Sequence, residues 1–151
     1  MALYRGVLTQ GGADTFTAAQ ILTGLTVDSK AGWQINGFKV FWSNGYLGAA
    51  QDAMANCVLS TLATVTTPNQ EDEIARVTWG IQNTAGVAVA MGIEPIKQAL
   101  VTEPRVTVQS DLYVHGSTVT TGLTNIFYFE ISYDIIKMSE LEVMRLMIGG
   151  A

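Results

Sequence analysis

The sequence predicts an all-β fold, a sandwich or barrel of about eight antiparallel strands. Three observations predict it: runs in which apolar residues fall on every second position, turn residues that separate these runs, and no alternation of strand-like and helix-like runs of the βαβ kind. Alternation lets each run bury one face in a core and keep the other outside. No internal repeat or linker divides the chain, so we expect a single domain over residues 1–151.

In the first half of the chain, β-prone runs alternate with glycine-containing turns. Strands are predicted over residues 3–9, 16–26 (with an interruption) and 33–42, and turns at 11–12 and 28–32. In the third run, Phe38, Val40 and Trp42 fall on one face and Phe41 on the other. Gly37 lies inside this run, and because an interior glycine weakens a regular strand it predicts a bulge or a bend.

A short helix is expected after the third strand. Residues 46–55 are rich in Ala, Gln and Met, and Leu47, Ala50 and Met54 have helical spacing. The remaining strands are predicted at residues 57–67, 74–81, 87–91, 105–108 with 110–115, and 126–136, with a loop over 68–73. For the first of these strands, helical spacing that extends through Leu62 is an alternative.

The last strand is long, and its solvent side is apolar at both ends. The face expected in the core carries an apolar residue at every second position: Phe127, Phe129, Ile131, Tyr133 and Ile135. On the opposite face the middle is polar, whereas Ile126 and Tyr128 at one end and Ile136 at the other are apolar. Contacts between subunits require an outer face of this kind.

A short C-terminal helix is predicted beyond this strand, because Ser139 and Glu142 fit a capping box. Leu141, Met144 and Ile148 then share one helical face. This apolar stripe either folds back on the protein's own sandwich or seats in a groove of a neighbouring subunit, and the sequence leaves both open.

Charged residues are scarce in this sequence. They make up 14% of the 151 residues, against about 25% in an ordinary soluble domain. A free monomer normally keeps a charged, mixed surface, so the deficit predicts an obligate oligomer. The net charge is −5, and before residue 39 only Arg5 and Lys30 are basic. Because no basic arm is present to neutralise phosphates, strong direct nucleic-acid binding is not expected.

The residues that usually carry catalysis are mostly missing. The single histidine, His115, is interpreted as a polar residue at a strand end beside a glycine turn. Asp111 lies about 13 Å from it along an extended strand, too far to orient the imidazole. The single cysteine, Cys57, is predicted to be a small buried core residue. Phosphate-binding, dinucleotide-binding and nucleophile-elbow motifs do not occur, so we assign no catalytic, cofactor-binding or metal-binding residue and expect no enzymatic activity, cofactor or small-molecule substrate.

Three consecutive carboxylates, Glu71, Asp72 and Glu73, form the most acidic stretch of the chain. They lack the alternating spacing of a dedicated calcium loop, and we interpret them as a solvated loop. A cation that bridges two subunits is the alternative.

The three tryptophans raise the question of carbohydrate binding. Trp42 and Trp79 share parity with apolar neighbours, which indicates core packing. Trp33 follows a turn and is the one expected to be exposed, where it could stack on a sugar. A β-sandwich carbohydrate-binding module is therefore the alternative function.

The segments "GWQINGFKVFW", "EDEIARVTWGI" and "NIFYFEISYDIIKMSELEVM" resemble parts of the single jelly-roll capsid proteins of small icosahedral viruses. The resemblance implies an all-β, eight-stranded antiparallel jelly-roll sandwich with a short helical insertion and a short C-terminal helix. It also implies a structural capsid (shell) protein that self-assembles through subunit interfaces into an icosahedral particle. Such a protein is made in the host cytoplasm and located in the virion.

The resemblance also bears on partners. Those it implies are copies of the same chain and other capsid proteins. Many capsid proteins of this size have a Lys/Arg-rich N-terminal arm, and "MALYRGVLTQGGADTF" has none. Two explanations stay open: the genome is neutralised by polyamines or an internal membrane layer, or the chain is a vertex or other minor shell protein. The expected subunit interface comprises Phe41, Tyr128, Ile136, Leu141, Met144 and Ile148.

Overall fold

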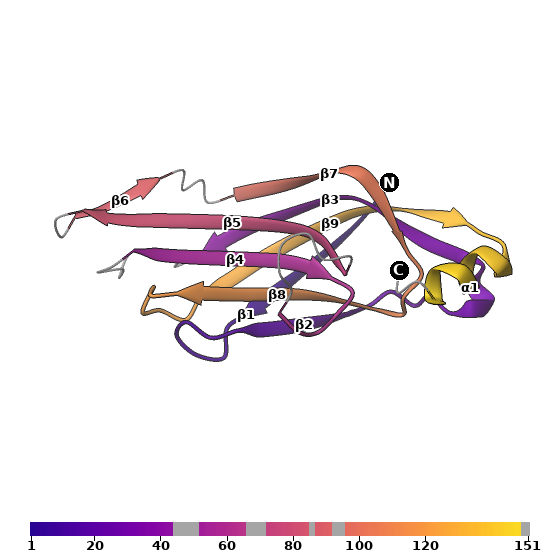
Figure 1. The fold of residues 1–151 in the computed structure, drawn as a ribbon, viewed down its shortest axis with the longest axis horizontal. Coiled ribbons are helices and arrows are strands. Elements are labelled where there is room, and N and C mark those ends of the chain that lie inside the picture. Colours follow the sequence, from indigo (N-terminus) through magenta and orange to yellow (C-terminus); the bar gives the residue numbers. More distant parts are fainter. Residues whose placement is uncertain (44–51, 66–71, 85–86, 92–95, 149–151) are drawn as a thin grey trace.

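The computed structural model describes residues 1–43, 52–65, 72–84, 87–91 and 96–148, and this part of the chain is built almost entirely of β-strands (Figure 1). Its elements, in chain order, are β1 (Ala2–Thr9), β2 (Thr17–Leu22), the 3₁₀ helix η1 (Val27–Ser29), β3 (Ala31–Ser43), β4 (Ala53–Ser60), β5 (Glu73–Thr84), β6 (Val87–Met91), β7 (Ile96–Thr107), β8 (Asp111–Val119), β9 (Ile126–Lys137) and α1 (Glu140–Ile148).

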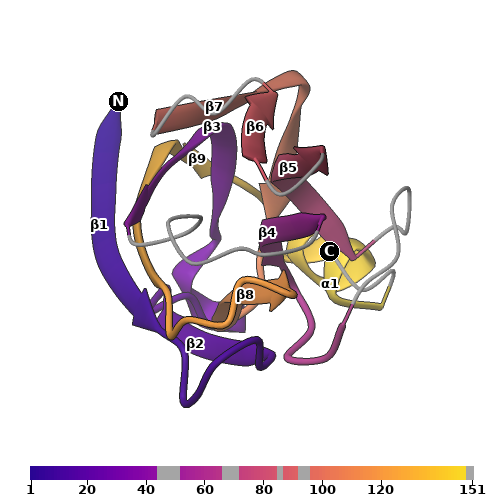
Figure 2. The ribbon, with the colours of Figure 1, turned by 90° about the vertical axis from the view of Figure 1, so that its left-hand side faces the viewer.

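The strands form two antiparallel sheets that enclose the core between them (Figure 2). Sheet A has the strand order β1-β9-β3-β7, and sheet B the order β2-β8-β4-β5-β6. Early strands pair with late ones: β1 with β9, β2 with β8, β3 with β7, and β4 with β5. This nested pairing is an antiparallel ribbon rolled up on itself, the jelly-roll topology. The predicted fold class is therefore confirmed, with the hairpin strand β6 added to the eight strands of the roll.

The predicted helix over residues 46–55 mostly lies outside the described residues, which resume at Asp52. Where it can be compared it is wrong, because β4 begins at Ala53. This strand is hydrogen-bonded to β5 on one side and β8 on the other, and two-sided pairing outweighs the helical preference of Ala and Met. The strand also ends earlier than expected, at Ser60.

The bulge predicted at Gly37 is confirmed. The pairing of β3 with both β7 and β9 shifts register between Ile35 and Gly37. One extra residue reverses the parity of a strand, so core residues before and after the bulge can face the same side. The buried side chains of β3 accordingly change from odd to even positions: Trp33, Ile35, Phe38, Val40 and Trp42.

Two strands in the second half differ from their predicted bounds. Strand β7 begins at Ile96 and continues through Pro104, although the sequence predicts a strand only from Arg105. Because β7 is an edge strand of sheet A, a proline without an N–H group is tolerated there. Strand β8 continues through Gly116 instead of turning at it.

The core contains an aromatic cluster of Trp42, Trp79 and Phe127, where the end of β3 pairs with the start of β9. The ring centroids of the two tryptophans lie 5.2 Å apart, and that of Phe127 lies 6.5 Å from Trp42 and 6.1 Å from Trp79. Cys57 is also fully buried, as predicted, and burial raises the pKa of its thiol. It therefore behaves as a small apolar residue.

Two glycines let large side chains fit between the sheets. A Cβ atom at Gly116 would lie 2.7 Å from Leu8 and 2.8 Å from the ring of Phe127. A Cβ atom at Gly6 would lie only 2.5 Å from the ring of Phe129, the residue that pairs with Gly6 across β1 and β9. Each glycine therefore provides the space that a neighbouring aromatic ring occupies.

We predict that Gly6→Ala lowers the free energy of unfolding by about 1–3 kcal/mol, because a closely packed core cannot move the ring of Phe129 without strain. Gly80→Ala is the matched control, since nothing lies within 4 Å of a Cβ added at that exposed position of β5. Urea denaturation followed by tryptophan fluorescence measures both variants. Equal stability losses would contradict the packing argument.

Candidate functional site

His115 lies in the middle of β8 and not, as predicted, at a strand end beside a turn. It is buried, its Nε2 donates to the carbonyl oxygen of Leu62 at 2.5 Å, and the edge of its ring meets Phe16 at a centroid distance of 5.2 Å. Burial lowers the pKa of His115. Asp111 does not contact it and instead accepts a hydrogen bond from Gln20 at 2.8 Å. The imidazole thus holds the chain at Leu62 against sheet B.

In the acidic stretch, Asp72 and Glu73 are held by contacts within the chain. Glu71 lies outside the described residues, and the backbone carbonyl of Asp72 accepts a hydrogen bond from the N–H of Thr61 at 2.9 Å. Glu73 forms an ion pair with Arg76, with 2.7 Å between Oε2 and Nη2. Within the described ranges, no three His, Cys, Asp or Glu side chains come together as a metal site would require.

All three tryptophans are buried. The core positions predicted for Trp42 and Trp79 are confirmed, whereas the exposure expected of Trp33 is wrong. Trp33 is only 5% exposed and stacks on Tyr133, with 3.8 Å between ring centroids and 13° between ring planes. It faces inward because the register before the bulge at Asn36 places odd-numbered residues of β3 in the core. Trp33 therefore does not provide the exposed ring on which a sugar was expected to stack.

A buried polar cluster joins the end of β1 to the segment between β8 and β9. Asn125 donates from Nδ2 to the side-chain oxygen of Gln10 and to the carbonyl of Leu123, both at 2.9 Å, and accepts from the indole N–H of Trp42 at 3.0 Å. The amide of Gln10 in turn donates to Thr118 at 3.0 Å. Because these groups satisfy one another, the cluster serves the fold and offers no vacant polar group to a ligand.

Asp14 caps this cluster from the turn between β1 and β2. Its carboxylate accepts hydrogen bonds from the backbone N–H groups of Thr121 and Gly122, at 2.9 and 2.8 Å, and from the hydroxyls of Thr121 and Thr118. Burial alone would raise the pKa of Asp14, but these hydrogen bonds outweigh it and lower the pKa below its ordinary value.

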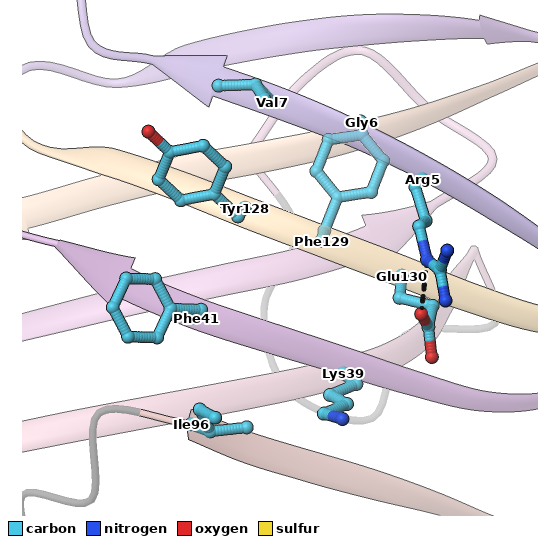
Figure 3. A pocket seen from close by; sticks show the side chains of 9 residues that line it. All are labelled: Arg5, Gly6, Val7, Lys39, Phe41, Ile96, Tyr128, Phe129 and Glu130. Carbon is cyan, nitrogen blue, oxygen red and sulfur yellow. Dashed lines mark hydrogen bonds and ion pairs between the residues drawn. The ribbon is translucent and has the colours of Figure 1, made fainter.

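An exposed apolar row crosses the outer face of sheet A from one edge to the other. The register pairs Val7 with Tyr128, Tyr128 with Phe41, and Phe41 with Ile96, so one residue from each of the four strands lies in the row. Their exposed fractions are 54% for Val7, 45% for Tyr128, 40% for Phe41 and 47% for Ile96. The rings of Phe41 and Tyr128 are 6.0 Å apart. Figure 3 shows the four side chains side by side.

The row borders a hollow of about 350 Å³ on the same face. Gly6 and Phe129 contribute to its lining, and a second row of charged residues bounds it on the other side (Figure 3). In this charged row, Arg5 pairs with Glu130 at 2.6 Å, and Lys39 faces Glu130 across the next pair of strands. Lys39 has no ion-pair partner among the described residues. The hollow is thus apolar at one end and carries an available cation at the other.

Helix α1 presents a second exposed apolar surface, and its first turn has the predicted capping box. Ser139 donates from its backbone N–H to the carboxylate of Glu142 at 2.8 Å, and its hydroxyl accepts from the N–H of Glu142 at 3.2 Å. The hydrogen bond from the Ser139 N–H lowers the pKa of Glu142. Val143 is the only buried residue of the helix, whereas Leu141, Met144 and Ile148 are 60%, 51% and 86% exposed.

The six residues predicted for a subunit interface therefore fall into separate groups. Phe41 and Tyr128 lie together in the apolar row, and Leu141, Met144 and Ile148 form the stripe on α1. Ile136 is half-buried near the far end of β9, opposite Gly32, and belongs to neither group.

Sequence reasoning missed Val7 and Ile96. Ile96 lies outside the strand that the sequence predicts from Arg105, and which residues of β9 and β3 the two side chains adjoin depends on strand order and register. Both strands lie far from their neighbours in the sequence, so no local signal could have placed them in the row.

No protein-family model matches the chain, and no curated protein matches it in sequence. Among solved structures, a chain from Desmodium yellow mottle tymovirus is similar at 10% sequence identity, over 91% of this chain and 89% of that chain, with a TM-score of 0.36. The jelly-roll assignment rests on the strand order above and not on this similarity. In the described ranges, no helix combines the length and hydropathy needed to cross a bilayer.

We predict that stability falls at acid pH partly through Asp14. A carboxyl group whose pKa is lower in the folded state stabilises the fold above its unfolded pKa of about 3.9 and loses this contribution as the pH falls through the folded value. Asp14→Asn should therefore lower the free energy of unfolding at pH 7 by about 1 kcal/mol. This is a small loss for a group that accepts several hydrogen bonds, because solvent reaches the carboxylate and weakens its interactions. It should flatten the pH dependence below about pH 4.

Urea denaturation between pH 3 and pH 7 measures the effect. Asp28→Asn, at an exposed residue of η1, makes the same charge change as a control. Identical pH profiles for the two variants would contradict the role of Asp14.

Proposed function

We propose that the protein is a structural viral capsid subunit that assembles with copies of itself into a closed icosahedral shell and has no enzymatic activity. The exposed apolar row across all four strands of sheet A is the observation that carries the proposal. The jelly-roll strand order and the resemblance of the sequence segments to jelly-roll capsid proteins are consistent with it. In this function the protein is located in the virion.

The row favours association because it is continuous. Scattered single apolar residues are ordinary on a protein surface, whereas a contiguous patch bordered by charges indicates a contact site. Val7, Phe41, Ile96 and Tyr128 are each about half exposed. Covering them completely would contribute roughly 3–6 kcal/mol, half of the value for burying four fully exposed side chains.

A shell subunit also needs more than one contact surface, and the chain has a second one on α1. The stripe of Leu141, Met144 and Ile148 points away from the body of the same molecule, which favours the neighbouring-subunit interpretation that the sequence left open. The low charged fraction of 14% agrees with a surface that is largely covered in an assembly.

Several basic residues already have partners within the chain and are therefore not available to bind the phosphates of a genome. Arg5, Arg76 and Lys30 are already paired with carboxylates, and Arg105 donates to the carbonyl of Glu73. With a net charge of −5, a partner other than this chain would neutralise the genome. Other capsid proteins and an internal membrane layer are the partners we propose for that task.

We predict that the purified protein assembles at micromolar concentration into particles far larger than its 16.2 kDa monomer. Size-exclusion chromatography with light scattering, repeated over a range of salt and pH, measures the mass. A species that stays monomeric under every condition would contradict the proposed function.

We also predict that nucleic acid does not co-purify with the protein at physiological salt, because few cations are available to release counterions from phosphates. The ratio of absorbance at 260 and 280 nm, followed through a salt gradient, tests this. Bound nucleic acid that dissociates with rising salt would instead indicate a coat that contacts the genome directly.

A further inference from the structure

We propose that the stripe of α1 from one copy of the chain seats in the hollow on sheet A of the next copy. The inference rests on the proposed function, since it names the two surfaces that would join neighbouring shell subunits. The proposed occupant of the hollow is the segment from Leu141 to Ile148 of a second copy of this chain.

The helix is held so that its stripe faces outward. Val143 is fully buried and anchors α1 against the body of the protein. At about 100° per residue, Leu141, Met144 and Ile148 lie about 100–160° around the helix axis from Val143. The side chain that tethers the helix therefore directs the stripe away from its own molecule, and the stripe is largely exposed.

The hollow cannot be filled by the helix of the same molecule. Tyr128 lies near the start of β9, whereas α1 begins beyond the other end of this strand, after Lys137. Nine residues of extended strand separate Tyr128 from Lys137, a distance of about 30 Å. Figure 1 shows α1 at one end of the sandwich, while β9 begins toward the other. An α1 helix that enters the hollow must come from another copy.

The two surfaces match in chemistry. The stripe offers three aliphatic side chains, and the hollow offers the apolar row of Val7, Phe41, Ile96 and Tyr128. Charges are also complementary: the hollow is bordered by two cations and one carboxylate, and α1 carries two carboxylates and one cation.

A contact between two different surfaces of the same chain is heterologous. Each copy gives its helix to one neighbour and its hollow to another, so this contact by itself extends into a ring, or into an open filament where the rotation does not close. Two hollows placed face to face, or two helices packed together, would instead make a two-fold contact that stops at a dimer. The two arrangements can therefore be distinguished by mixing variants.

The experiment uses one variant with a defective hollow and one with a defective helix. Phe41→Thr with Tyr128→Thr removes the centre of the apolar row and keeps residues suited to a strand. Leu141→Gln with Ile148→Gln removes the stripe and keeps residues suited to a helix. Met54→Thr with Val119→Thr is the matched control, since these two exposed apolar residues pair with each other across β4 and β8 of sheet B, at the end of β8 that lies away from α1 (Figure 1). Circular dichroism and thermal melting confirm that each variant folds.

We expect each defective variant alone to stay monomeric at concentrations about tenfold above those at which the unmodified chain assembles, because losing two anchors weakens the contact at least that far. The control should assemble normally. An equimolar mixture of the two defective variants should form a 1:1 dimer of about 32 kDa, twice the 16.2 kDa of one chain, and no larger species. In that dimer the intact helix of one partner fills the intact hollow of the other.

Two other results would overturn the inference, and each would indicate a different arrangement of the subunits. Dimers of the helix-defective variant alone would indicate face-to-face hollows, and normal assembly of both defective variants would place the contacts elsewhere. Each of these leaves the proposed function standing, whereas a permanently monomeric unmodified chain would contradict the function itself.

Cross-linking provides a second measurement that does not depend on loss of assembly. Cys57 is buried, so thiols introduced by Tyr128→Cys in one chain and Met144→Cys in another would be the accessible ones. Mild oxidation of the mixture should join unlike chains, and Val119→Cys mixed with Met144→Cys should not cross-link. Equal yields from both mixtures would contradict the seating of α1 in the hollow.

Discussion

Hydrogen bonding of the last strand between the first and the third is the constraint on which the structure depends. Strand β9 pairs with β1 from Thr9–Ile126 to Ala2–Tyr133, and with β3 along almost its whole length. The segments of β1 and β9 that meet are separated by more than 110 residues of sequence, as in the pairing of Arg5 with Glu130 at a separation of 125, and those of β3 and β9 by more than 80. Sheet A can therefore be completed only when the C-terminal third of the chain is in place, and such non-local pairing is typical of slow-folding β proteins.

This pairing also couples the core to the outer surface. Phe127, Phe129 and Ile131 must face inward to fill the space between the sheets, so Tyr128 and Glu130 must face outward. The register with β1 and β3 then sets Tyr128 beside Val7 and Phe41, and Glu130 beside Arg5 and Lys39. The apolar row and the charged row are thus fixed by the same hydrogen bonds that hold the sheet together.

Much of the fold could be predicted from local patterns. Alternation revealed most of the strands, Gly37 marked the bulge, and Ser139 with Glu142 marked the terminal helix. What failed depended on neighbours distant in sequence. Met54 and Ala55 join a strand because two other strands pair with them, and Gly116 continues a strand because the ring of Phe127 occupies the space of its missing side chain.

The candidate site was predictable only in part for the same reason. Phe41 and Tyr128 could be assigned to an outer face from parity alone, but their contact with each other required the register between β3 and β9. The inward position of Trp33 required knowing on which side of the bulge the parity changes. Patterns give the face of a residue, whereas its neighbours on that face come from the topology.

The bulge in β3 separates two kinds of sequence change. A deletion at Asn36 would restore regular alternation and turn either Trp33 and Ile35 or Phe38, Val40 and Trp42 out of the core, because one residue more or less reverses the faces of a strand. The number of residues in β3 is therefore tightly constrained. The identities of Val7, Phe41, Ile96 and Tyr128 are not constrained in this way, since their side chains lie outside the core. During evolution the outer row can thus change its binding preference by simple substitution, while the length of β3 stays fixed and the fold is conserved.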